Sequence, residues 1–136
     1  MAGTAVTSAL FSPDIRLSTF PEEWPHTEEN LSPRVLADNG FLFTGSSGKD
    51  EVQCFACGKV LDGWEPQDDV FQEHQRRNEC IYLTFLRRGG DPRNMPLRVG
   101  LEILRCIYDR RIASIESTIL EKSDILNALV KAKKTK

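Results

Sequence analysis

Long apolar runs are absent from this sequence. No stretch of about 18 consecutive apolar residues occurs, which excludes a membrane-spanning helix of ordinary length. Residues 1–11 also lack a basic segment followed by a long apolar one, so we expect no export signal and a protein of the nucleus and cytoplasm. Neither charge is in large excess, with 18 Lys and Arg against 20 Asp and Glu, and 40% hydrophobic residues exclude a disordered chain. A length of 136 residues suits one folded core with an appendage.

The small net charge hides a difference between the two parts of the chain. Residues 1–90 contain 14 acidic and 8 basic side chains, whereas residues 91–136 contain 6 acidic and 10 basic ones. An acidic first part disfavours contact with duplex DNA and favours a cationic partner such as a basic peptide tail. We therefore expect direct nucleic-acid binding to be weak at most, and confined to the basic second part.

Only four cysteines are present, and three of them follow the spacing of a metal site. Without an export signal, metal ligation is favoured over the alternative of two disulfides. Cys54 and Cys57 flank a tight turn, in which Gly58 relieves backbone crowding. His74 follows after sixteen residues, and Cys80 after five more. We predict one structural Zn²⁺ in a closed Cys₃His shell, which leaves no open position for catalysis, so we expect no enzyme. A core histidine with unrelated cysteines is the alternative.

Turn residues divide the first 90 residues into short elements of two kinds. Helical spacing and capping residues alternate with runs of β-branched and aromatic residues. The predicted fold is α+β: a small three-stranded antiparallel sheet surrounded by short helices. The helices are expected at 14–20, 33–38, 70–77 and 81–87, and the strands at 41–44, 52–55 and 59–64.

A long amphipathic helix is expected from Leu97 to Lys131, because apolar residues recur there in steps of three and four. Four segments follow: a loose arm over 1–13, the zinc-binding domain over 14–88, a linker over 89–96, and the helix with a basic tail over 97–136. Ile103 and Ile107 widen the apolar stripe, which favours a helical bundle with partners over folding back onto the domain. The stripe consists of Leu97, Leu101, Leu104, Tyr108, Ile112, Ile115, Ile119, Leu126 and Leu129.

An ordered set of motifs over residues 14–87 resembles the BIR repeat of inhibitor-of-apoptosis proteins. One BIR repeat, no RING finger and a long C-terminal helix are most similar to the survivin-type members of this family. The family usually has six residues between the histidine and the last cysteine, so we expect a tighter turn after His74. The motifs are Arg16-Leu-Ser-Thr-Phe20, Trp24-Pro25, Leu36-Ala-Asp-Asn-Gly40-Phe41, Thr44-Gly45, Val52-x-Cys54-Phe55-x-Cys57, Leu61-Asp-Gly-Trp-Glu-Pro66 and Asp68-Asp69.

The resemblance implies a groove for the free N-terminus of a peptide beside the third strand. In the family, acidic side chains meet the ammonium group, and the first methyl group enters a small pocket near a tryptophan. Leu61, Asp62, Trp64 and Asp68 match these positions. Two carboxylates around an aromatic wall can neutralise an ammonium, and strand addition supplies backbone hydrogen bonds. Alternatively, Trp64 is a core residue and Asp68 with Asp69 only starts a helix.

The resemblance also implies a phosphate contact at Arg77, where survivin-type members have a histidine that contacts phosphothreonine. Lys59 matches a second position near the phosphate, and a guanidinium offers a bidentate fork to phosphate. We predict a threonine-phosphorylated Ala-Arg-Thr histone tail as the ligand. The alternative is that Arg77 contacts no phosphate and is only part of a solvated helix face. The alternative function is inhibition of apoptosis through caspases or Smac-like Ala-Val-Pro peptides, for which the missing aromatic residue at position 77 is unfavourable.

For the long helix, the resemblance implies a bundle with borealin-like and inner-centromere-protein-like helices that localises Aurora kinase. The chain would then be a chromosomal passenger subunit of centromeres, spindle midzone and midbody during mitosis and cytokinesis. Survivin-type members also use the region after Gly90 for homodimers, so a homodimer is an alternative to the bundle.

Overall fold

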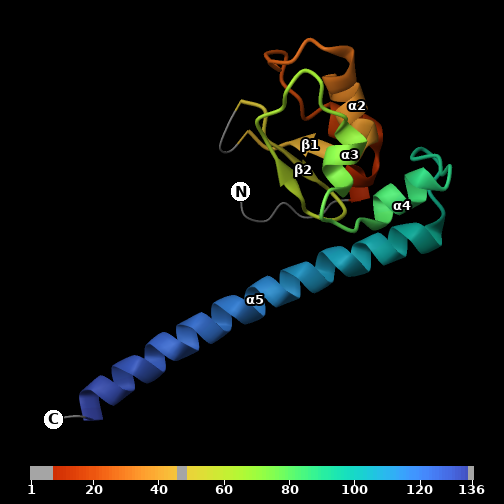
Figure 1. Ribbon diagram of the computed structural model, residues 1–136. Helices are drawn as coiled ribbons and strands as arrows, with labels where there is room; N and C mark the ends of the chain where they lie inside the picture. The colour runs from red at the N-terminus through yellow and green to blue at the C-terminus, as the bar shows by residue number, and fades with distance from the viewer. Residues whose placement is uncertain (1–7, 46–48, 135–136) are drawn as a thin grey trace.

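Short helices and one small sheet form a globular unit, and a long helix follows it (Figure 1). The computed structural model describes residues 8–45 and 49–134. This arrangement confirms the predicted α+β fold. The elements are the 3₁₀-helices η1 (Ser8–Phe11) and η2 (Glu29–Leu31), the α-helices α1 (Pro13–Leu17), α2 (Pro33–Asp38), α3 (Val70–Gln75), α4 (Ile81–Arg87) and α5 (Leu97–Lys134), and the strands β1 (Phe41–Phe43), β2 (Val52–Cys54) and β3 (Val60–Leu61).

The sheet is antiparallel with the order β1-β2-β3, so β3 is an edge strand. Phe41 pairs with Cys54, and Val52 pairs with Leu61, which directs the buried side chains of β1 and β2 into one core. The third strand is shorter than predicted. Beyond it, the N–H groups of Gly63 and Trp64 donate to the carboxylate of Asp50 at 3.0 and 2.9 Å instead of pairing with β2.

Capping side chains set the bounds of the first helices. Ser32 accepts a hydrogen bond from the N–H of Val35 at 3.3 Å, and a proline occupies the first turn of α2, as the sequence predicts. The first helix ends at Leu17, earlier than expected. The hydroxyls of Ser18 and Thr19 donate to the preceding carbonyls of Ile15 and Arg16, both at 2.6 Å, which competes with further helical hydrogen bonds.

The N-terminal segment differs from the loose arm that the sequence predicts over 1–13. Its first seven residues lie outside the described residues, but residues 8–13 form η1 and the start of α1. The ring of Phe11 packs edge-on against Phe55 with centroids 5.1 Å apart, and the carbonyl of Leu10 accepts a hydrogen bond from Arg16 at 2.8 Å. Apolar contacts therefore fix the second half of this segment onto the core.

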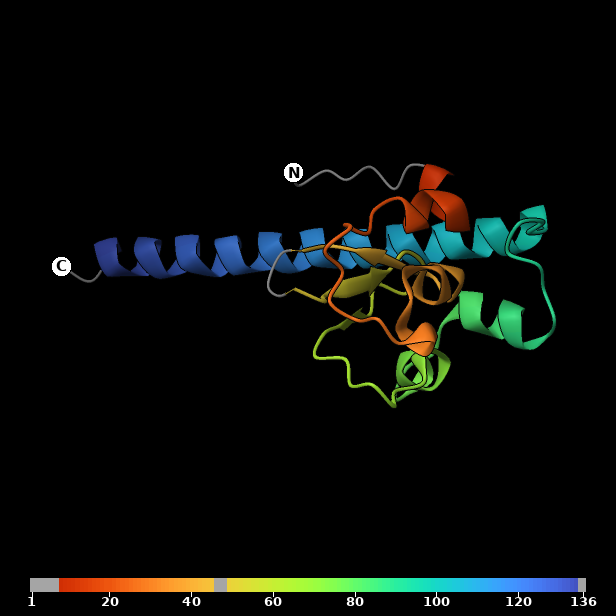
Figure 2. The same cartoon turned by 90° about the horizontal axis from the view of Figure 1, so that it is seen from above.

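Helix α5 has a docked part and a projecting part (Figures 1 and 2). Ile103 and Ile107 are only 0% and 2% exposed, and the first turns of α5 contact α4. From Tyr108 to residue 133 every side chain is exposed. Among the stripe residues Leu104 is half-buried and the others are exposed, and the last two residues of the basic tail lie outside the described part of the chain. No helix in the described ranges is long and apolar enough to cross a membrane.

Candidate metal centre and peptide groove

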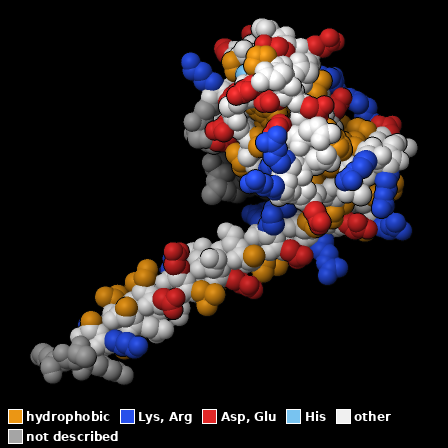
Figure 3. Space-filling view, viewed as in Figure 1, with side chains coloured by type: hydrophobic (Ala, Val, Ile, Leu, Met, Phe, Trp, Pro, Cys, Tyr) orange, Lys and Arg blue, Asp and Glu red, His pale blue; other side chains and the backbone are white. Residues whose placement is uncertain are grey.

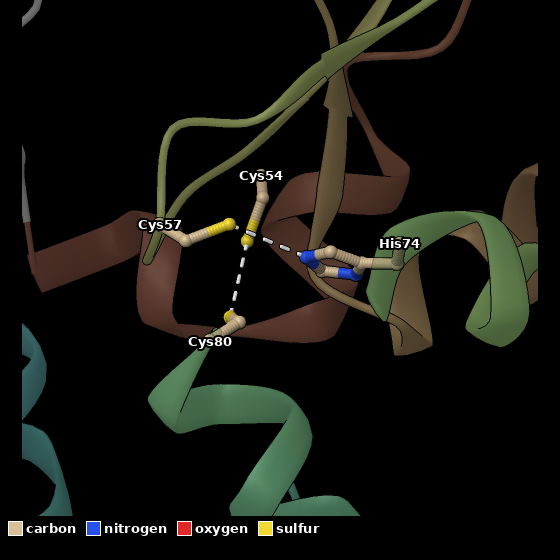
Figure 4. Close-up of side chains that lie close together, drawn as sticks. All are labelled: Cys54, Cys57, His74 and Cys80. Carbon is tan, nitrogen blue, oxygen red and sulfur yellow. Dashed lines mark hydrogen bonds between the residues drawn. The ribbon is translucent and has the colours of Figure 1, made fainter. Parts of the chain in front are cut away.

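Four predicted ligands meet at one point where separate elements converge (Figure 4). Cys54 ends β2, Cys57 lies in the turn after it, His74 belongs to α3, and Cys80 is the N-cap residue of α4. Their ligand atoms all lie within 4.8 Å of one another. Cys106 is not a member of this cluster, in keeping with its position outside the predicted spacing.

The distances in this cluster fit a tetrahedral metal ion. Cys54 Sγ lies 3.9 Å from Cys80 Sγ, and Cys57 Sγ lies 3.5 Å from His74 Nε2. An ion bonded at about 2.3 Å to sulfur and about 2.0–2.1 Å to nitrogen would separate two sulfurs by about 3.8 Å, and sulfur from nitrogen by about 3.6 Å. The residues present can therefore hold one metal ion, and the donor set fits the zinc site of the family that the motifs resemble.

The electrostatics of the cluster also favour a bound cation. Burial raises the pKa of the Cys54 thiol, while hydrogen bonds from the Cys54 and Cys80 thiols lower the pKa of Cys57. Three thiols so close together cannot all ionise unless a positive charge compensates them. A divalent ion supplies that charge, and its binding then becomes part of the free energy of folding.

Two features allow the chain to turn within the five residues between His74 and Cys80. Arg77 adopts a left-handed conformation, with φ of 51°, and reverses the chain within a few residues. The ammonium of Lys59 donates to the carbonyls of Glu73, His74 and Arg76 at 2.6, 3.2 and 2.7 Å, which caps the end of α3. Lys59 thus stabilises the framework of the metal centre.

A family model of the BIR domain, described as the Inhibitor of Apoptosis domain, matches residues 16–84. The chain belongs to the BIR family. The matched range contains all four residues of the metal cluster, so the predicted resemblance is confirmed.

The chain is similar to several BIR proteins over about half of its length. It is 38% identical over 79 residues to Baculoviral IAP repeat-containing protein 5.2 of Xenopus tropicalis, covering 56% of this chain and 50% of that protein. Identity to Baculoviral IAP repeat-containing protein 1b of Mus musculus is 48% over 63 residues, 46% of this chain and 4% of that protein. A solved structure, DIAP1 BIR1 bound to a Grim peptide, is 35% identical with a TM-score of 0.49, covering 71% of this chain and 90% of that chain. The match thus spans only a small part of the mouse protein.

A pocket of about 340 Å³ lies beside the edge strand of this BIR domain. Acidic side chains dominate it, with Arg76 as the only cation among the lining residues. Four predicted groove residues lie here together, but Lys59 and Arg77 are not among the lining residues. The full lining is Leu61, Asp62, Gly63, Trp64, Glu65, Asp68, Glu73 and Arg76.

Glu73 and Arg76 line the same pocket, and sequence reasoning missed both of them. Their side chains form an ion pair of 2.8 Å at the rim of the pocket. The spacing of three residues on the predicted helix 70–77 was a signal that the two side chains share one helix face.

Trp64 combines the two roles that the sequence left as alternatives. It is 6% exposed and packs edge-on against Phe41 with centroids 6.0 Å apart, so it belongs to the core. It also lines the pocket. The two neighbouring acids differ in role. Asp69 caps α3 by accepting a hydrogen bond from the N–H of Gln72, whereas Asp68 lines the pocket.

Asp50 positions the loop that forms one wall of the pocket. Besides the two loop N–H groups, it accepts a hydrogen bond of 2.9 Å from the ring of His26. Burial raises the pKa of Asp50, but the hydrogen bonds from His26 and the two backbone N–H groups outweigh burial and hold the pKa below its ordinary value. A carboxylate with a lowered pKa contributes stability above its unfolded pKa and loses it as the pH falls through the folded pKa, so the contribution is fully present at neutral pH.

Asp50→Asn is expected to lower the free energy of unfolding by about 1–2 kcal/mol at neutral pH, because an amide cannot accept all three hydrogen bonds. Chemical denaturation of the metal-loaded chain measures this loss. Asp62→Asn, a matched change at an exposed acid of the same pocket, should leave the stability nearly unchanged. Equal stability of Asp50→Asn and the parent would show that Asp50 does not hold the loop.

Proposed function

We propose that this chain is a non-enzymatic binding module whose structural ion is Zn²⁺ and whose acidic pocket binds the free N-terminus of a peptide. The observation that carries this proposal is the position of the pocket. Asp62 and Asp68 lie beside β3, the edge strand of the described sheet, and an extended peptide can add to such an edge. An ammonium group can meet the carboxylates while the peptide backbone pairs with the strand.

The ligand that we propose is a threonine-phosphorylated histone tail. Arg77 is exposed and follows the pocket-lining Arg76 in the chain, and the Arg76 guanidinium is paired with Glu73. A peptide with an ammonium at one end and a phosphate a few residues later matches this distribution of charge. Arg77 remains the predicted phosphate contact, and Arg76 is a second cation within the pocket. Lys59, the other predicted contact, would act through its charge alone, because its three N–H groups donate to the carbonyls of Glu73, His74 and Arg76.

For the projecting part of α5, we propose a helical bundle with borealin-like and inner-centromere-protein-like partners. Figure 3 shows hydrophobic side chains in separate patches along this part of the helix, between charged ones. Ile112, Ile115 and Ile119 are each more than half exposed, which is costly unless a partner covers them. The chain would then act as a survivin-like chromosomal passenger subunit that localises Aurora kinase at centromeres, spindle midzone and midbody, with its free form in the nucleus and cytoplasm.

Calorimetric titration of the zinc-loaded chain tests the peptide proposal. We expect an Ala-Arg-Thr-Lys-Gln peptide with phosphothreonine to bind at least about tenfold more tightly than the unphosphorylated peptide, and Arg77→Ala to remove that preference. Acetylation of the peptide N-terminus should abolish binding because it removes the ammonium charge. Tighter binding of Ala-Val-Pro-Ile would instead favour the alternative, an inhibitor of apoptosis that binds caspases or Smac-like peptides.

Asp68→Ala should weaken binding of the phosphopeptide by about tenfold or more while the chain stays folded. Its control is Asp124→Ala, at an exposed acid on the projecting part of α5. Unchanged affinity in Asp68→Ala would exclude this pocket as the ammonium site.

A further inference from the structure

The docked part of α5 ends on the turn that connects two residues of the metal cluster. Arg110 donates a hydrogen bond of 2.6 Å from Nη1 to the carbonyl oxygen of Ala56, which lies between Cys54 and Cys57. Ala56 is 3% exposed, and its own N–H donates to Cys54 Sγ at 3.3 Å. This residue is therefore held from two sides, by a cysteine sulfur and by a guanidinium from the distant helix.

The guanidinium of Arg110 lies close against the turn. Gly58 has a φ of +79°, and a Cβ placed on it would come within 3.0 Å of Arg110 Nε. Ile103 and Ile107, on the same face of α5, are buried in the domain. In the described part of the chain, the hydrogen bond from Arg110 to the domain lies at the start of the projecting part of α5.

We propose that Arg110 is a positioning residue of the metal centre, through which α5 helps to retain the ion. This inference rests on the zinc centre of the proposed function. A Cys₃His site with a divalent ion has a net charge of −1, so a nearby guanidinium is electrostatically favourable. Release of the ion requires the turn at Ala56 to open, and the hydrogen bond from Arg110 opposes that opening. Hydrogen bonds made directly to ligating residues typically change metal affinity by about 10–100-fold, and we expect the contact of Arg110, with the residue between two ligands, at the low end of that range.

The coupling acts in both directions. If docking of α5 stabilises the metal-loaded turn, the metal-loaded turn stabilises docking of α5 by the same free energy. The orientation of the projecting helix therefore depends on the metal centre through Arg110, together with the apolar contacts of Ile103 and Ile107.

The test is the rate of zinc release from the full chain to an excess of chromophoric chelator. After the parent has been shown to hold one equivalent of zinc, we expect Arg110→Gln to release it about tenfold faster, at the low end of the range because the side chain is exposed. Arg111→Gln, a change of equal charge at the exposed neighbouring residue, should release zinc at the parent rate. Arg110→Lys should recover part of the difference.

Hydrogen exchange gives a second measurement on the zinc-loaded proteins. The amides of Ile103 and Ile107 should exchange faster in Arg110→Gln than in Arg111→Gln. Parent-like zinc release in Arg110→Gln, or equal acceleration in both variants, would overturn the proposal. A parent that holds no zinc would overturn the metal centre itself and this proposal with it.

Discussion

His74→Ala is expected to release the metal ion and unfold the globular unit. Binding of a structural zinc ion is worth about 10–16 kcal/mol at neutral pH, whereas small domains are stable by only about 5–15 kcal/mol. The side chain of His74 is fully buried, and its ring lies 4.4 Å from that of Phe41. The substitution removes one of four ligands and also leaves a cavity at the centre of the core.

Far-ultraviolet circular dichroism and zinc stoichiometry measure this outcome together. The control is His26→Ala, which changes the only other histidine in the chain. His26 is hydrogen-bonded to Asp50 but is not part of the metal cluster, so this variant should keep its zinc and lose about 1–2 kcal/mol. A cooperative melt of zinc-free His74→Ala near the parent temperature would contradict a structural metal centre.

Arg16→Ala is expected to cost about 3–5 kcal/mol of unfolding free energy, because it empties a buried site and leaves polar groups without partners. Arg16 is 0% exposed, and burial lowers its pKa. Its guanidinium donates to the carbonyls of Ala37 and Leu10 and to the Tyr82 hydroxyl, at 2.9, 2.8 and 2.9 Å. It also lies 4.4 Å from the ring centroid of Phe55, which offsets part of the cost of the buried charge.

Thermal and denaturant unfolding of the zinc-loaded variants test this prediction. Arg34→Ala is the control, because Arg34 is exposed and pairs with the exposed Asp14, an arrangement that contributes little to stability. Arg16→Lys should fall between the parent and Arg16→Ala, since an ammonium keeps the charge but cannot reach all three acceptors. A parent-like melt of Arg16→Ala would show that the buried guanidinium gives no net stability.

Sequence reasoning found the metal cluster because its chemistry is local. Cys54 and Cys57 share one turn, and the spacing to His74 and Cys80 restricts where the chain can return. The lining of the acidic pocket was predicted only in part. Leu61, Asp62, Trp64 and Asp68 follow one another along the chain and match family motifs. Asp50 acts on the pocket only through hydrogen bonds from the loop after β3.

The α+β class, the short capped helices, the metal cluster and the length of the final helix follow from the amino-acid sequence alone, because spacing and capping act over a few residues. The buried face of α5, by contrast, depends on how the helix packs against the domain. Ile103 and Ile107, which widen the stripe, are buried, whereas Leu101 and Tyr108 of the stripe itself are exposed. Periodicity alone cannot distinguish a face that packs on its own domain from one left open. The same is true of Arg110, an ordinary surface arginine in the sequence, whose contact with the metal turn depends on how the helix docks.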